Sequence, residues 1–316
     1  MRAISQAKFG GPEVLEAVEI SEPKPAAGEV LVQVKATSMN PLDAKIRSGA
    51  LWFLTGRKFP KVLGCDVSGV VLEVGSGVTR FKKGDAVAGL ISILNGKPGA
   101  NCERVAVAEA HLALKPPGVS FLDAAALPVG ALTGWQVLKL FGNAGPGSKV
   151  LINGASGGVG TFAVQLGKLL GAEVTAVCSA RNAELVRSLG ATHVIDYATT
   201  DFRAQGAKYD VVFDVVHTAP FGGCRAVLAR GGLWAGTMPS PAGMLGKVVA
   251  ALLGFRVQFA DANSQMAQLP GLLALVEQGK LKVVTEQVLP LAELAQAHRL
   301  SEAGRVRGKI VIKVAD

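Results

Sequence analysis

Three glycines recur at regular spacing near the middle of this chain. Gly154, Gly157 and Gly160 form the pattern G-x-x-G-x-x-G between a strand-like run at 148–153 and a helix-like run at 161–170. A glycine-rich turn between a strand and a helix can receive a pyrophosphate, because the backbone N–H groups at the start of the helix then face the phosphate oxygens. The turn predicts a bound dinucleotide; the alternative is a tight turn that holds no ligand.

Each glycine of this turn has its own expected task. Gly154 is expected to allow the tight exit from the strand, Gly157 to let phosphate oxygens approach the backbone, and Gly160 to let helix and strand pack closely. The remaining residues that we expect around the phosphates are Ala155, Ser156, Gly158 and Val159.

The end of the next strand-like run, at 173–178, indicates which dinucleotide is bound. Sites that prefer NAD(H) usually place Asp or Glu there to hold the ribose 2′-hydroxyl. Here the run is followed by Ser179, Ala180, Arg181 and Asn182, with no acid, and Ser179, Arg181 and Asn182 are expected to contact the cofactor. A hydroxyl and a guanidinium can hydrogen-bond a 2′-phosphate that a carboxylate would repel, so NADP(H) is predicted. The alternative is that Arg181 is only a solvated residue at a helix start.

The composition is typical of an α/β enzyme in a reducing compartment. The 316 residues suffice for two domains, and 49% are hydrophobic while only 5% are aromatic. The four cysteines are far apart in the sequence and form no C-x-x-C pair, so we expect free thiols and a cytoplasmic location. The N-terminal residues read directly as a strand and not as a secretion leader, and no apolar run approaches the ~20 residues of a membrane span.

The net charge of +9 is spread over the chain. Lys and Arg residues form no long run and no patch interleaved with aromatic residues, so neither a nucleic-acid partner nor a membrane partner is predicted. A positive chain attracts a multiply charged anionic cofactor, which is the simpler explanation.

The pattern of strand-like and helix-like runs changes twice along the chain. Residues 1–123 carry short alternating runs separated by Pro and Gly turns, which indicates a β-rich domain. From 124 to 262, strand-like runs alternate with helix-like runs, which predicts a parallel, doubly wound sheet. Residues 263–316 then return to strands. We therefore expect an α/β protein in which a β-rich domain of residues 1–123 and 263–316 is split by a nucleotide-binding domain of residues 124–262.

Several segments in this order resemble the medium-chain dehydrogenase/reductase superfamily. The resemblance covers nearly the whole chain and is closest to the zinc-independent branch of quinone oxidoreductases and enone reductases, including the chloroplast-envelope quinone oxidoreductase homologues. It implies a GroES-like β-rich catalytic domain and a Rossmann NADP(H)-binding domain. The segments that carry it are 40–49, 64–71, 74–87, 125–134, the glycine turn and 308–311.

The same resemblance implies roles for single residues. Lys45 and Asn40 are expected on a wall that faces the nicotinamide, where they could act on the substrate. Lys45 could instead be a solvated helix residue, and Asn40 could merely cap the turn that begins at Pro41. Thr133 is expected beside the nicotinamide or bonded to its own helix backbone. The further positions at which the family implies cofactor contacts are Asp43, Tyr197, Val215, Thr237 and Lys309.

Residue types argue against the zinc-dependent alcohol dehydrogenase branch. Those enzymes resemble this chain but need a thiolate near 40–43 and a G-H-E triplet, and this chain has Gly64, Cys65 and Asp66 instead. One thiol beside one carboxylate does not make a three-ligand zinc site. The four histidines lack metal-binding spacing and are expected to be ordinary. Neither Tyr197 nor Tyr209 lies where a phenolic acid would be expected.

The expected activity is transfer of hydride from NADPH to a quinone or to the C=C bond of an α,β-unsaturated carbonyl. Hydride addition creates an enolate, whose oxygen needs hydrogen-bond donors. An enoyl-thioester reductase or a non-enzymatic NADPH-binding protein, of the crystallin or RNA-binding type, is the alternative. Apolar segments at 51–54, 91–94 and 238–255 favour a hydrophobic substrate. The strand-like run at 256–260 is the expected contact of a homodimer.

Overall fold

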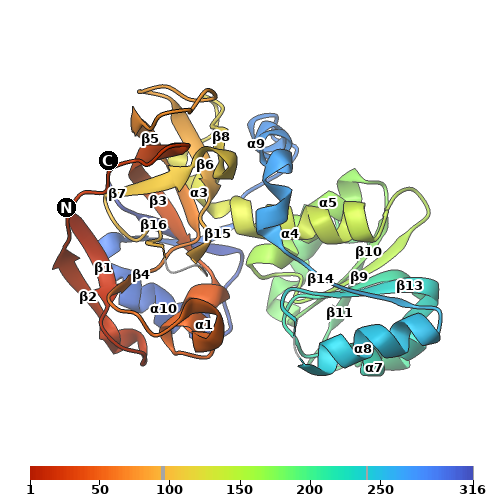
Figure 1. Cartoon of the computed structure of the whole chain (residues 1–316). Coiled ribbons are helices and arrows are strands. Elements are labelled where there is room, and N and C mark those ends of the chain that lie inside the picture. The colour runs from red at the N-terminus through yellow and green to blue at the C-terminus, as the bar shows by residue number, and fades with distance from the viewer. Residues whose placement is uncertain (94–96, 240, 316) are drawn as a thin grey trace. The chain divides into compact units, whose positions relative to one another are not determined.

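The computed structural model describes residues 1–93, 97–239 and 241–315, and the chain in it divides into two compact units. One unit combines Met1–Val129 with Asn263–Asp316, and the other is the continuous segment Gly130–Ala262. The β-rich unit therefore draws on both ends of the chain (Figure 1).

The continuous unit is built on a six-stranded sheet in the order β11-β10-β9-β12-β13-β14. Every neighbouring pair in it is parallel, as the alternation of strands and helices predicts. The chain leaves β9 in one direction to reach β10 and β11 and later returns to β12 on the other side of β9. Ligands of such sheets bind beyond the carboxyl ends of the strands at this reversal. The strands are β9 (Lys149–Asn153), β10 (Glu173–Cys178), β11 (His193–Asp196), β12 (Tyr209–Asp214), β13 (Leu228–Gly236) and β14 (Arg256–Phe259).

Helices complete the crossovers between these strands. Buried residues of β9, β10, β12 and β13 form one apolar core with residues of the α7 region and the last turns of α8. Helix α6 ends where Gly190 takes a left-handed conformation, with φ of 114°. The helices of this unit are α5 (Gly158–Leu169), α6 (Ala183–Leu189), α7 (Phe221–Cys224), α8 (Pro241–Leu252) and most of α4 (Pro128–Trp135), whose first two residues belong to the β-rich unit. A π-helical segment, Gln136–Phe141, follows α4.

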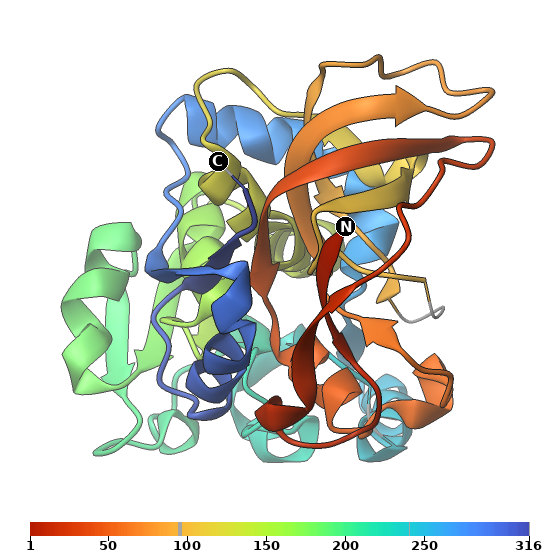
Figure 2. The same cartoon turned by 90° about the vertical axis from the view of Figure 1, so that its left-hand side faces the viewer.

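The other unit contains a seven-stranded sheet and a three-stranded sheet. Strand β3 (Glu29–Met39) is the centre of the larger sheet because it pairs with β5 and β7, which follow it in the chain, and with β16 at the other end of the chain (Figure 2). The smaller sheet has the order β2-β1-β4. The remaining strands are β1 (Arg2–Gln6), β2 (Leu15–Glu19), β4 (Lys61–Val62), β5 (Asp66–Val74), β6 (Ala86–Leu90), β7 (Arg104–Ala108), β8 (Leu112–Leu114), β15 (Thr285–Pro290) and β16 (Lys309–Lys313).

Short helices connect and cover these two sheets. They are α1 (Pro41–Arg47), α2 (Trp52–Thr55), α3 (Phe121–Ala126), α9 (Leu269–Glu277) and α10 (Leu294–Glu302). Among the described residues, no helix is long and apolar enough to cross a membrane.

The first boundary between the units differs from the expected one. It falls between Val129 and Gly130 and not between residues 123 and 124. The reason is α3, whose Ala125 and Ala126 pack against Ala36 of β3 and Val311 of β16. A run of apolar helical residues does not reveal which sheet it covers, so the sequence could not place α3.

Helix α10 holds a histidine in an apolar setting. The His298 ring is fully buried, and its two nitrogens have no hydrogen-bond partner among the described residues. Burial, with a smaller effect of the nearby Arg47, lowers the pKa of His298 from 6.5 to about 3. Because protonation is harder in the folded state, the contribution of this group to stability is complete above pH 6.5 and is lost as the pH falls toward 3.

We therefore predict that the folded protein loses roughly 2 kcal/mol of unfolding free energy through His298 between pH 7.5 and pH 5. The His298→Leu variant should lose that much less than the wild type in urea-unfolding curves at the two pH values. His193→Gln, at an exposed histidine, is the control and should keep the wild-type dependence. Equal acid sensitivity of His298→Leu and wild type would contradict the prediction.

Candidate active site

The glycine turn follows β9 and opens α5, at the carboxyl edge of the parallel sheet. Gly154 has φ of +86°, a conformation that favours glycine. A Cβ at Gly160 would lie 2.2 Å from the carbonyl oxygen of Gly154, so only glycine lets the helix approach the turn this closely. The local geometry predicted for these two residues is present.

Gly157 differs from the other two glycines. Its backbone is extended, with φ of −84° and ψ of −178°, and it is the N-cap of α5. The nearest atom to a Cβ built there is the Gly154 carbonyl oxygen at 3.6 Å. A Cβ at Gly157 would thus meet no atom closer than ordinary van der Waals contact, and the first N–H groups of a twelve-residue helix begin next to it. This arrangement fits an anionic group at the reversal point of the sheet.

The residues expected around the adenosine end lie beside this turn. Ser179 follows β10 and caps the short turn Ala180–Asn182, in which Arg181 is exposed. The Asn182 side chain is buried, and its Nδ2 donates to Ser156 Oγ of the glycine turn at 2.9 Å and to Ser179 Oγ at 3.3 Å. The exposed Tyr197 lies beside the end of β10, because its N–H donates to the carbonyl of Cys178. The structure therefore brings these predicted residues together.

The loop after β12 is held by a buried carboxylate. Asp214 is fully buried, and its two oxygens accept from Asn153 Nδ2 at 3.0 Å and from the N–H of Ala219 at 2.8 Å. Asn153 Nδ2 also donates to Thr218 Oγ1 at 2.9 Å. The N–H of Val215, a predicted cofactor contact, donates to the Asn153 carbonyl. The ends of β9 and β12 are thus fixed to each other at the reversal point.

This loop also carries a residue that the sequence did not single out. His217 has φ of 58°, which few residues other than glycine adopt. Its Nε2 lies 2.7 Å from Oγ1 of Thr237, a predicted cofactor contact at the end of β13. A lone histidine without metal-ligand spacing matches no known site pattern in a sequence. The one signal available is its place shortly after a strand of the predicted nucleotide-binding sheet.

Several other predicted site residues form a buried polar cluster in the β-rich unit. Its centre is Asp66, which is fully buried and accepts four hydrogen bonds. Asp66 Oδ1 accepts from the Val129 N–H at 2.8 Å, and Oδ2 accepts from Asn40 Nδ2 at 2.9 Å, from Lys309 Nζ at 3.2 Å and from Ser38 Oγ. Lys309 Nζ also donates to Asn40 Oδ1 at 2.6 Å. The ammonium and the carboxylate neutralise each other inside the protein.

Asp43 belongs to the same region and caps α1. Its oxygens accept from the N–H groups of Asn40 at 2.9 Å and of Gly64 at 3.0 Å. Burial raises the pKa of Asp43 to about 6, although both hydrogen bonds oppose that shift. Burial, together with the nearby carboxylates, raises the pKa of the Cys65 thiol well above its usual value. This thiol therefore stays protonated near neutral pH.

These contacts bear on four predicted roles. Asn40 is the N-cap of α1 and its side chain is engaged with Asp66 and Lys309, while its role toward a substrate stays a prediction. Asp43 and Lys309 are 1% and 4% exposed within the β-rich unit. Thr133 is 5% exposed within α4. Cofactor contacts of these residues stay predictions.

Lys45 is placed differently from the cluster. It lies in the last turn of α1 and is only partly buried, and that burial lowers the pKa of its ammonium group. Helix α1 is fixed at its start by the capping contacts of Asn40 and Asp43. The buried cluster thus orients the helix that carries Lys45.

The apolar segments expected to line a substrate pocket are only partly exposed. Trp52, Phe53 and Leu54 are exposed, whereas Ile91 and Ile93 are buried. Leu94 and Ser240, which fall within two of these predicted walls, lie outside the described residues.

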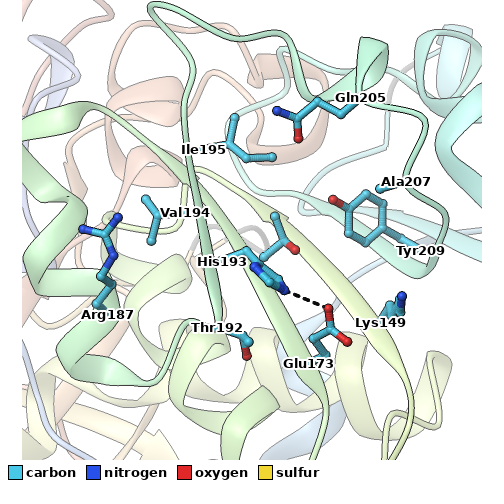
Figure 3. A pocket seen from close by; sticks show the side chains of 11 residues that line it. Lys149, Glu173, Arg187, Thr192, His193, Val194, Ile195, Gln205, Ala207 and Tyr209 are labelled. Atoms are coloured by element: carbon cyan, nitrogen blue, oxygen red, sulfur yellow. Dashed lines mark hydrogen bonds and ion pairs between the residues drawn. The ribbon is translucent and has the colours of Figure 1, made fainter.

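A pocket of about 510 Å³ lies in the nucleotide-binding unit, at the amino ends of its strands (Figure 3). His193 Nε2 and Glu173 Oε1 meet in it at 2.9 Å. Dinucleotides bind at the opposite, carboxyl edge of such sheets. This pocket is therefore separate from the candidate cofactor site. The other residues that line it are Lys149, Thr175, Arg187, Thr192, Val194, Ile195, Gln205, Ala207 and Tyr209.

Known proteins resemble the chain over its whole length. The model of the alcohol dehydrogenase GroES-like domain matches residues 26–137, and that of the zinc-binding dehydrogenase family matches residues 189–312. A chloroplast envelope quinone oxidoreductase homolog of Arabidopsis thaliana is 37% identical, covering 99% of this chain and 98% of that protein. The chain belongs to the quinone oxidoreductase branch of the medium-chain dehydrogenase/reductase superfamily.

Further relatives agree with this membership. A 2-methylene-furan-3-one reductase of Solanum lycopersicum is 36% identical over 99% of this chain and 79% of its own length. The solved structure of the quinone oxidoreductase from Coxiella burnetii has a TM-score of 0.92 at 33% identity, covering 100% of this chain and 99% of that one. The Escherichia coli quinone oxidoreductase, solved in complex with NADPH, has a TM-score of 0.87 at 28% identity, covering 99% and 100%.

Family membership confirms the fold class predicted from the sequence, a GroES-like domain with a Rossmann domain. As a quinone oxidoreductase family member, the protein is an oxidoreductase that uses a nicotinamide cofactor. The open space at Gly157 and the hydroxyls of Ser156 and Ser179 fit the phosphates of such a cofactor.

The Gly157→Val variant should lose more than about 100-fold in affinity for both NADPH and NADH, because a branched side chain would occupy the space beside the helix start. Its melting temperature should change little, since a Cβ at Gly157 meets no close protein atom. Cofactor fluorescence titration and thermal unfolding measure the two effects. Gly160→Ala is the contrasting control and should be destabilised by its clash with Gly154. Retained affinity in folded Gly157→Val would show that phosphate does not bind at this turn.

Proposed function

We propose that this protein is an NADPH-dependent reductase that transfers hydride to quinones or to the C=C bond of α,β-unsaturated carbonyls. The observation that carries the proposal is the end of β10, where Ser179 and Arg181 lie beside the glycine turn and no acid follows the strand. Relatives named as quinone oxidoreductases and as a 2-methylene-furan-3-one reductase support the substrate classes.

Preference for NADPH follows from charge. A 2′-phosphate carries negative charge that an acid at the end of β10 would repel, and the exposed guanidinium of Arg181 can form charge-assisted hydrogen bonds with it. Tyr197, which is 65% exposed, also lies next to the end of β10. Both side chains are exposed near the place proposed for the adenosine end of the cofactor.

The cofactor supplies the hydride when it is bound. After the hydride reaches the carbon β to the carbonyl, negative charge collects on the enolate oxygen, and a donor placed there lowers the barrier. We assign this task to Lys45, because it is a cation that is only partly buried on a helix anchored by the buried cluster. The lowered pKa of its ammonium group also makes it a stronger acid than an ordinary lysine.

We propose that the reaction does not use zinc, although one matching family model is named for zinc binding. Asp66, at the position of a potential ligand, is already neutralised by the ammonium of Lys309 and bonded by Ser38 and Asn40. The neighbouring Cys65 supplies one thiol, and among the described residues no group of three His, Cys, Asp or Glu side chains is placed to hold a metal ion. These residues do not fit a three-ligand zinc site.

Two further proposals concern substrate and assembly. The exposed Trp52, Phe53 and Leu54 support a hydrophobic carbonyl or quinone as substrate. Strand β14 is the last strand of the parallel sheet and pairs on one side with β13, so its other edge can pair with a second copy in a homodimer.

A cytoplasmic location remains part of the proposal. All four cysteines are free and buried, which suits a reducing compartment. Relatives include proteins named as chloroplastic and mitochondrial, so direct localisation of the protein in cells is the test of its compartment.

Oxidation of NADPH should be measured against a panel of short enals, alkyl enones, ortho- and para-quinones and crotonyl thioester. We expect turnover with quinones or enones. Lys45→Ala should lower kcat about 10- to 100-fold with little change in NADPH affinity, because the ammonium acts on charge that develops during hydride transfer. Lys83→Ala, at an exposed lysine of the same unit, is the control.

Three results would change the proposed function. Turnover of the thioester alone would identify an enoyl-thioester reductase. Tight NADPH binding without turnover would favour a non-enzymatic role. Zinc at one atom per chain, with activity lost to a chelator, would place the protein in the zinc-dependent branch.

Arg181→Ala should weaken NADPH binding about 10- to 100-fold and change NADH binding little, since only NADPH has the 2′-phosphate. Calorimetric titration with each cofactor measures the difference. The matched control is Arg187→Ala, which removes an exposed arginine of α6 that lines the pocket at the amino edge. Equal losses for both cofactors would refute the assignment of Arg181 to the phosphate.

A further inference from the structure

Asn182 connects the two segments that are proposed to hold phosphates. Ser156 belongs to the glycine turn after β9, and Ser179 follows β10. The side-chain Nδ2 of Asn182 donates to both serine oxygens, at 2.9 Å and 3.3 Å. Its own N–H is bonded to the Ser179 carbonyl at 2.9 Å, so the residue is fixed by its backbone and by its side chain.

The direction of these hydrogen bonds determines what the serines can do. An amide NH₂ group only donates, so each serine oxygen accepts from Asn182. Each hydroxyl proton must then point away from Asn182. Ser156 and Ser179 are only partly buried, and their protons are therefore available to an acceptor from outside the protein. Phosphate oxygens are such acceptors.

The side-chain oxygen of Asn182 lowers the stability of the fold. Asn182 Oδ1 is buried and has no hydrogen-bond partner among the described residues, on a side chain that is 4% exposed. A buried unsatisfied acceptor lowers stability. The opposite orientation of the amide would turn both hydroxyl protons inward and leave the NH₂ group without an acceptor. The observed orientation therefore keeps the two hydrogen bonds to the serines and leaves the amide oxygen without a partner.

We propose that Asn182 is a positioning residue that turns the hydroxyl protons of Ser156 and Ser179 toward the cofactor. Ser156 then donates to the pyrophosphate and Ser179 to the 2′-phosphate, and Asn182 strengthens the preference for NADPH without touching it. This inference rests on the proposed use of NADPH.

Two substitutions of Asn182 separate orientation from packing. In Asn182→Asp, a carboxylate accepts both hydroxyl protons and adds negative charge, so NADPH affinity should fall about 100-fold and NADH affinity about 10-fold. In Asn182→Ala, the serines rotate freely, and NADPH affinity should fall about 5- to 10-fold. The melting temperature of the cofactor-free Asn182→Ala protein should change little, because removal of the unsatisfied acceptor offsets the loss of the two donated hydrogen bonds.

Ser179→Ala provides the coupling test. It should weaken NADPH binding about 10-fold in the wild-type background and hardly at all in Asn182→Asp, because there the hydroxyl no longer faces the cofactor. Fully additive losses would overturn the inference. So would a lower melting temperature of cofactor-free Asn182→Ala with equal losses for NADPH and NADH, since that result describes a purely structural residue.

Arg181→Ala distinguishes failure of this inference from failure of the proposed function. If Arg181→Ala weakens NADPH selectively while Asn182→Asp does not, only the role of Asn182 is wrong. If neither variant changes the preference between the cofactors, the use of the 2′-phosphate is wrong and the proposed NADPH specificity falls with it.

Discussion

The close approach of α5 to the turn after β9 is the constraint on which the cofactor site depends. A Cβ at Gly160 would lie 2.2 Å from the Gly154 carbonyl oxygen, and only its absence lets the helix start directly at the carboxyl edge of the sheet. The free N–H groups of the helix, the hydroxyl of Ser156 and the end of β10 then lie around one place. The backbone geometry of the turn and of α5 therefore decides which hydrogen-bond donors and which partial charges face that place.

The β-rich unit depends on a different interaction. Its buried carboxylate, Asp66, joins residues of β3, the start of α4 and β16 through four hydrogen bonds. A buried charge is tolerated only when it is paired and its oxygens are satisfied, and Lys309 supplies the pairing. Removal of either partner would leave the other charged and buried. The helix that carries Lys45 is thus oriented by a cluster that need not contact a substrate itself.

Polar residues of this protein therefore fall into two groups that the sequence does not separate. Asn40, Asp43 and Lys309 are buried and satisfy one another, while Lys45 and Arg181 remain partly or fully exposed. Asn182 belongs to neither group, since it is buried and leaves an acceptor unsatisfied. Its proposed role is to orient Ser156 and Ser179 toward the cofactor.

The sequence alone determined those features that depend on residues close together along the chain. Alternation of strands and helices, the glycine turn and the missing acid after β10 are local patterns, and they predicted the parallel sheet, its ligand edge and the choice of cofactor to test. Tertiary structure decided the rest, because Lys309 meets Asn40 across 269 positions of sequence and His217 meets Thr237 across 20. Such pairs, and the sheet that α3 covers, are decided only when the chain folds. They depend on which distant side chains become buried together.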